Sequence, residues 1–101
     1  MRLTDRQRTL IRATVAETFG PEANVWLFGS RVDDSKRGGD INLLIETSRI
    51  DVDAIARAEI SFLTKLQMKL GEQKIDLLID YPSRKTRPPI LSIAKQSGIL
   101  L

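Results

Sequence analysis

The chain has 101 residues and a formal net charge of +3; 42% of its residues are hydrophobic and 29% are charged. This composition is typical of one small globular domain, and no apolar run approaches the roughly 18 residues of a membrane span. The absence of cysteine and histidine excludes disulfides, thiolate nucleophiles, imidazole bases and His/Cys zinc sites, so catalysis would depend on carboxylates, hydroxyls, Lys and Arg.

The N-terminal part of the chain predicts a helix followed by a strand. Thr4 begins a capping-box pattern with Gln7, and apolar residues then recur at helical spacing until Gly20, so we expect a helix over residues 4–19. The β-prone run at residues 24–28, Asn-Val-Trp-Leu-Phe, predicts a strand, and its Trp side chain is expected in the core, with a partner-facing position as the alternative.

The middle of the chain alternates between loops, strands and one long helix. Residues 31–39 are polar, charged and end in glycine, which predicts a loop that can begin with a short helical turn. Alternation of apolar and polar residues predicts strands over 40–46 and 74–81. Between them, Asp51 can cap an amphipathic helix over 52–70.

The C-terminal part predicts a basic loop and a last helix. Residues 82–89 carry a dense basic stretch, expected either as a solvated loop or as a contact for ATP phosphates or for an acidic or RNA-bearing partner. Pro89 can start a helix that Gly98 ends. The resulting order, α-β-β-α-β-α, predicts an α+β fold with helices on a small mixed sheet, in a single domain over residues 1–101.

Oxygen-bearing side chains are expected at one end of the two alternating strands. Asp40 and Asn42 are two residues apart, so they leave the same face of their strand about 6.5–7 Å apart. Asp76 occupies the equivalent place in the later strand. If the strands are neighbours, the three side chains converge. Two Mg²⁺ ions about 3.5–4 Å apart need such a cluster when they clamp the attacking and leaving oxygens of a phosphoryl transfer.

The residues before the first of these strands complement the acidic cluster. Gly29 directly follows a predicted strand, where a glycine lets the backbone approach a phosphate closely. Ser30 adds a hydroxyl and amide donors, and Arg31 can neutralise phosphate charge or brace a carboxylate. Each feature alone is weak, but their combination in one order favours a functional origin.

This arrangement resembles a minimal nucleotidyltransferase (MNT) domain of the DNA polymerase beta superfamily. The hallmark of that family is Gly-Ser, a loop of about ten residues, Asp-x-Asp and a later acidic residue. Here it reads Gly29-Ser30, nine residues, Asp40-Ile41-Asn42 and then Asp76. The chain is also similar to the small bacterial MNT antitoxins that pair with HEPN toxins. The resemblance covers most of the chain and implies a polymerase-beta-like palm fold.

The resemblance further implies Mg²⁺-dependent transfer of AMP from ATP to a tyrosine of the HEPN toxin, while other members neutralise their toxin chiefly by binding. Gly29 and Ser30 would hold the nucleotide phosphates, with Arg31 beside them. Asp40 would bind both metal ions, and Asp76 would bind the catalytic one and help to activate the incoming hydroxyl.

Asn42 departs from the family pattern, because it stands where the second metal-bridging Asp belongs. Its amide oxygen can coordinate Mg²⁺ but brings no charge and cannot act as a base. Three interpretations stay open: a weakened enzyme, a binding-only antitoxin that kept the fold, or an altered copy of an active parent. A nucleotide-transferring enzyme that acts on a drug or metabolite ranks last, since no second substrate-holding domain is recognisable.

The expected partners are therefore a HEPN-family toxin, in a hetero-oligomer, and a nucleotide. The mild positive charge does not predict direct DNA binding, and no segment predicts a membrane contact. Without cysteine, and without a signal-peptide pattern at the N-terminus, the chain is expected in the cytoplasm.

Overall fold

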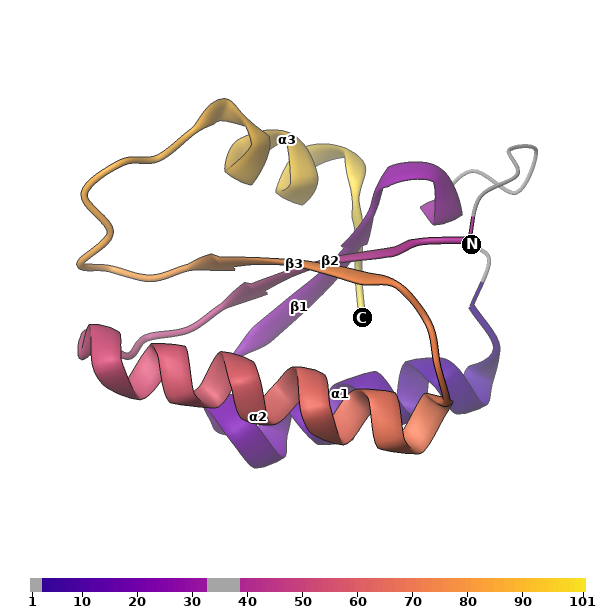
Figure 1. The fold of residues 1–101 in the computed structure, drawn as a ribbon. Coiled ribbons are helices and arrows are strands. Elements are labelled where there is room, and N and C mark those ends of the chain that lie inside the picture. Colours follow the sequence, from indigo (N-terminus) through magenta and orange to yellow (C-terminus); the bar gives the residue numbers. More distant parts are fainter. Residues whose placement is uncertain (1–2, 33–38) are drawn as a thin grey trace.

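The computed structural model of this protein describes residues 3–32 and 39–101. In these residues, three α-helices and one four-stranded mixed sheet form an α+β fold of three layers. Helices α1 (Asp5–Phe19) and α2 (Val52–Leu70) lie on one face of the sheet, and α3 (Pro89–Ser97) lies on the other (Figure 1). No helix in this described part of the chain is long and apolar enough to cross a lipid bilayer.

The helix ends form as the local sequence predicts. Thr4 Oγ1 accepts a hydrogen bond from the Gln7 N–H at 3.0 Å, and Gln7 Oε1 accepts one from the Thr4 N–H at 2.9 Å, which completes the capping box of α1. At the start of α2, Asp51 accepts hydrogen bonds from two backbone amides of the first turn. Every predicted helix and strand is present with ends within one residue of the expected positions.

The sheet has the order β3-β2-β1-β4. Its strands are β1 (Asn24–Phe28), β2 (Ile41–Glu46), β3 (Ile75–Asp80) and β4 (Ile99–Leu100). Strand β1 runs antiparallel to β2 and β4, whereas β2 and β3 run parallel and are connected through α2. The three longer strands, β1, β2 and β3, thus lie beside one another in the sheet in the same order as in the chain. Helix α2 supplies the crossover connection that the parallel pair β2 and β3 requires.

The predicted element order was wrong at its end, because it stopped at the last helix and omitted β4. This strand has only two residues, Ile99 and Leu100, too few to show an alternating pattern. It pairs with Trp26 and Leu27 of β1, and the Leu101 N–H donates to the Val25 carbonyl at 2.8 Å. The C-terminal residues thus close the free side of β1.

The main core lies between the sheet and the α1–α2 layer. There Phe19 and Phe62, both fully buried, meet edge to face with ring centroids 6.3 Å apart. A second, smaller cluster lies under α3 on the other face of the sheet. It consists of buried Leu44, Leu91 and Ala94 with partly buried Trp26, Phe28 and Leu78. Trp26 was expected in the core, and it is a partly buried member of this second cluster.

Candidate functional site

The two alternating strands meet in a register that brings the predicted oxygen-bearing side chains together. Asn42 of β2 lies directly opposite Asp76 of β3. The Ile41 N–H donates to the Lys74 carbonyl at 3.0 Å, which continues the ladder back to the level of Asp40. Asp40, Asn42 and Asp76 therefore lie together where β2 and β3 begin, as expected if these two strands are neighbours.

The three side chains differ in their exposure. The Asp40 side chain is 45% exposed, and its Oδ2 lies 3.5 Å from the Lys74 ammonium nitrogen. Asn42 is partly buried between its two neighbouring strands, whereas Asp76 is exposed on the edge strand. In the described part of the chain, the site is thus a partly exposed ledge at the beginning of two parallel strands.

Gly29 lies on the other side of Asn42. It follows β1, whose last residue, Phe28, pairs with Asn42, and it has a φ of +80°. A Cβ at this position would overlap the side-chain amide nitrogen of Asn42. The positive φ therefore favours glycine here, and any Cβ would force the end of the Asn42 side chain to move. This contact joins the Gly-Ser turn to the oxygen cluster.

The remaining predicted residues lie in or beside the turn. Gly29 to Val32 form a short 3-10 helix, η1, which confirms the expected helical turn at the start of the loop. Arg31 donates from Nη2 to the Gly39 carbonyl at 2.9 Å, so its guanidinium links the two ends of the 31–39 loop. The placement of the Ser30 side chain lies outside what the structure describes, as do residues 33–38 of the predicted loop.

The donor set of this ledge is suited to a hard cation. Two carboxylates and one amide oxygen are oxygen ligands of the kind that Mg²⁺ accepts. The Lys74 ammonium beside Asp40 would compete with a cation for that carboxylate. Among the described residues, however, no group of three or more Asp, Glu, His or Cys side chains could hold a metal ion. The cluster has two formal negative charges where the family pattern has three, and the missing charge is at Asn42.

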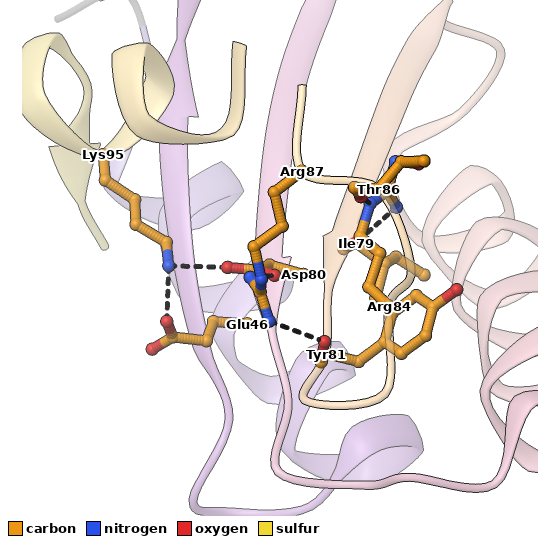
Figure 2. Close-up of polar contacts among 8 residues, drawn as sticks. All are labelled: Glu46, Ile79, Asp80, Tyr81, Arg84, Thr86, Arg87 and Lys95. Carbon is orange, nitrogen blue, oxygen red and sulfur yellow. Dashed lines mark hydrogen bonds and ion pairs between the residues drawn. The ribbon is translucent and has the colours of Figure 1, made fainter. Parts of the chain in front are cut away.

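A second polar cluster occupies the other end of the same sheet face (Figure 2). Glu46 lies directly opposite Asp80 in the β2–β3 ladder. Lys95 of α3 donates from Nζ to Glu46 Oε2 at 2.5 Å and to Asp80 Oδ2 at 2.8 Å. Arg87 donates to Asp80 Oδ1 and to the Tyr81 carbonyl, the latter at 3.0 Å. We call Glu46, Asp80, Arg87 and Lys95 the clasp.

The clasp is partly shielded from water, which affects the ionisation of its members. Burial alone would raise the pKa of Asp80, but the hydrogen bond and charge of Lys95, and then those of Arg87, outweigh it, so the pKa is lowered. Burial alone would lower the pKa of Lys95, but the hydrogen bonds and charges of Asp80 and Glu46 raise it. Both groups are therefore held in their charged forms.

The clasp fastens the C-terminal segments to the sheet. Lys95 connects α3 to the central strand β2 and the edge strand β3, and its ammonium also lies 5.5 Å from the centre of the Trp26 ring. Arg87 ties the loop after β3 to Asp80, whose side chain is only 7% exposed. A cleft of about 450 Å³ borders these residues, but each of their charges has an opposite charge beside it. The arrangement indicates a structural role.

The basic loop, residues 82–89, also makes contacts that hold segments of this chain together. Arg84 donates to the Ile79 carbonyl at 2.9 Å and to the Thr86 carbonyl at 2.7 Å, and its guanidinium lies 5.8 Å from the Tyr81 ring centre. With Arg87 in the clasp, both arginines of the loop bind groups of this chain. Sequence reasoning missed the clasp, although the alternation that pairs Asn42 with Asp76 also pairs Glu46 with Asp80 four residues later.

Comparison with known proteins adds no family assignment. A scan against protein-family models finds no match for this chain. A search of the curated proteins also finds no match. The motif and the geometry around Asn42 are therefore the grounds on which a function can be proposed.

Proposed function

We propose that this protein is a minimal nucleotidyltransferase of the DNA polymerase beta superfamily. In this proposal it acts as an antitoxin that transfers AMP from ATP to a tyrosine of a partner HEPN toxin. The observation that carries it is the row formed by Gly29 in the turn after β1, Asn42 in β2 and Asp76 in β3. Three motif elements that are far apart in the sequence are neighbours in this row, as a nucleotidyl-transfer site needs.

The residues of the ledge would divide the work according to their chemistry. Asp40 and Asp76 would hold Mg²⁺ through their carboxylates, and Asn42 would add an uncharged amide oxygen. The bound metal would polarise a phosphoryl oxygen and so favour attack on the α-phosphorus. Gly29 and Ser30 would place backbone amides against the nucleotide phosphates, close to Asn42.

In the proposed reaction, the tyrosine hydroxyl of the partner attacks the α-phosphorus of ATP. A bond forms between the phenolic oxygen and the α-phosphorus, while the bond from the α-phosphorus to the bridging oxygen breaks and pyrophosphate leaves. The phenolic proton is released, and in this proposal the exposed carboxylate of Asp76 would help to accept it. Attack from the open side of the ledge suits a hydroxyl carried by a second protein.

The exposure of the ledge supports a protein substrate. Asp76 is exposed and the Asp40 side chain is 45% exposed, so the described part of the chain does not enclose a small substrate at these residues. Small-molecule sites are usually concave and bury most of their ligand. A partner that covers the ledge would exclude water and supply the remaining contacts.

The direct test combines this chain with the protein encoded beside it, ATP and Mg²⁺, and weighs the partner by intact mass spectrometry. We expect a gain of one or more AMP units. The variants Asp40→Asn and Asp76→Asn remove the two charged ligands, and Gln96→Glu serves as a surface control of altered charge. No gain with the native chain or with Asn42→Asp would contradict the enzymatic proposal.

A second candidate function, neutralisation by binding alone, is favoured by one specific observation. Asn42 leaves the ledge without a third carboxylate, and the described residues contain no three-acid metal group. In that case the partner would be inhibited with no change in mass, even with Asn42→Asp. A mass gain found only with Asn42→Asp would instead identify a nucleotidyltransferase whose activity was lost at this residue.

A further inference from the structure

The outer face of α2 is apolar, in contrast to that of its neighbour α1. The two helices pack against each other on one face of the sheet, and no other described element covers the outer side of α2 (Figure 1). Helix α1 exposes charged residues such as Arg12 and Glu17. On α2, however, Ile60 is 67% exposed and Met68 is 81% exposed. Helix faces that stay in solvent normally carry polar side chains, so the outer face of α2 is suited to a protein contact.

The exposed apolar residues of α2 belong to one ridge with a clear centre. Residues four apart on a helix are neighbours on its surface, and five such residues of α2 are exposed and uncharged: Val52, Ala56, Ile60, Thr64 and Met68. Ile60 is the middle member of this α2 ridge, and the two end members lie about 12 Å from it along the helix axis. A ridge that is symmetric about one residue can meet a second copy of itself through a two-fold axis at that residue.

The two ends of α2 differ in shape in the way that such a contact needs. At the beginning of the helix, Ile50 and Val52 are exposed and protrude from the layer. At its end, nothing lies within 4 Å of the place where Gly71 would carry a Cβ. A hollow of about 500 Å³ is found there, lined by Gln67, Met68, Glu72 and Gln73. In an antiparallel pair of α2 helices, the protruding end of each copy lies beside the hollow of the other.

The charges at the two ends of α2 favour the same direction. The helix begins with the acidic residues Asp51 and Asp53, and its last turn contains Lys69. An antiparallel copy places each acidic end beside the basic end of its partner and aligns the helix dipoles in opposite directions. A parallel copy would place like charges together. The contribution is modest, because Lys69 also pairs with Glu17 of its own chain.

We infer that α2 binds the α2 helix of a second copy of this chain, antiparallel, with the two-fold axis at Ile60. Asn42 and Asp76 lie on the sheet face turned away from α2, because the residue before each of them packs into the α1–α2 core. Both ledges thus stay open in the dimer, and the inference goes beyond the proposed function without depending on it. One helix offers less than the roughly 800 Å² per partner of a standard interface, so we expect a reversible dimer with a dissociation constant on the order of 100 μM.

Sedimentation equilibrium over a range of protein concentrations tests the association. The average mass of the native protein should rise from that of one chain toward that of two. Ile60→Lys places two like charges at the axis and should weaken the association by about tenfold or more. Ile93→Lys makes the same change at an exposed isoleucine of α3 and should associate as the native chain does. Circular dichroism confirms that each variant is folded.

Disulfide cross-linking tests the direction of the pair, because the native chain has no cysteine. Ile60→Cys should form a linked dimer by itself, since the axis brings the two copies of residue 60 together. Ala56→Cys should link to Thr64→Cys in a mixture faster than to itself, because residues 56 and 64 are equally far from the axis. Gln96→Cys, on the exposed side of α3, measures the rate of chance encounters.

Each of the possible contrary results has a defined meaning. A native chain that stays monomeric at every concentration would overturn the inference and leave the α2 ridge to a different protein. Equal association of the native chain and Ile60→Lys, or equal cross-linking of Ile60→Cys and Gln96→Cys, would also overturn it. Faster linking of Ala56→Cys to itself than to Thr64→Cys would overturn the antiparallel direction. AMP transfer to the partner is measured separately, so its success or failure is distinguishable from all of these.

Discussion

Asn42 of β2 lies directly opposite Asp76 of β3 in a parallel ladder, and this pair is the centre of the candidate site. On one side of Asn42 is the edge strand with Asp76, and on the other is the glycine turn after β1. An uncharged amide thus lies between Asp76 and the glycine turn. The identity of this one side chain controls both the charge of the ledge and its contact with the turn.

Asn42→Asp should strengthen metal binding. The change restores a third carboxylate beside Asp40 and Asp76, and affinity for hard cations rises with the number of charged ligands, so we expect a gain on the order of tenfold. Mn²⁺ titration measures the effect. Gln96→Glu adds the same charge on α3, and an equal gain in that control would contradict a local role for residue 42.

Gly29→Ala should destabilise the fold through two separable effects. Its φ of +80° is unfavourable for a residue with a Cβ, and the new methyl group would overlap Asn42. Gly71→Ala has a similar φ of +83° but nothing within 4 Å of its Cβ, so it measures the backbone effect alone. We expect each to lose about 1–3 kcal/mol of unfolding free energy, with the larger loss at Gly29.

The excess loss at Gly29 should disappear in an Asn42→Ala background, because the overlapping amide is then absent. Urea denaturation of the single and double variants forms a double-mutant cycle that isolates this contact. A cycle with no coupling energy would show that the close approach to Asn42 does not constrain residue 29.

Lys95→Met should destabilise the protein by removing the cation between Glu46 and Asp80. The two carboxylates would then lie opposite each other, with only Arg87 left on Asp80. Because the Lys95 side chain is 29% exposed, solvent screening limits the expected loss to about 1–3 kcal/mol in urea denaturation. Lys85→Met should stay within about 0.5 kcal/mol of the native chain.

The clasp should also make stability depend on pH in a defined direction. The pKa of Asp80 is lowered from its ordinary 3.8, so its contribution is complete above that pH and is lost as the pH falls through the lowered pKa. The pKa of Lys95 is raised from 10.5, so its contribution is complete below that pH and is lost as the pH rises through the raised pKa.

Asp80→Asn provides the measurement for the acid side. The variant has no ionisable group at this position, so its unfolding free energy should fall less steeply than that of the native chain as the pH is lowered from about 4 to about 2. Denaturation in urea across this range tests the expectation. Parallel slopes for the two proteins would mean that other carboxylates carry the acid sensitivity.

Local physical chemistry in the sequence determines the helices, the three longer strands and the positions of the motif residues. The capping box at Thr4, the cap at Asp51 and the glycines that end the helices act within a few residues, so the chain itself specifies these boundaries. Alternation likewise assigns Asn42 and Asp76 to the face of their strands opposite the apolar residues of the main core. What it leaves open is whether those strands are neighbours and in which register they pair.

Only the tertiary structure decided the contacts between distant segments. The parallel register that joins Asn42 to Asp76 also joins Glu46 to Asp80, and the packing of α3 then brings Lys95 to the second pair. Strand β4 forms by pairing with the edge of β1 that β2 leaves free. These features depend on hydrogen bonds and charges between residues far apart in the chain, which no local pattern encodes. The motif thus defines the parts of the candidate site, and the strand register determines which of them meet.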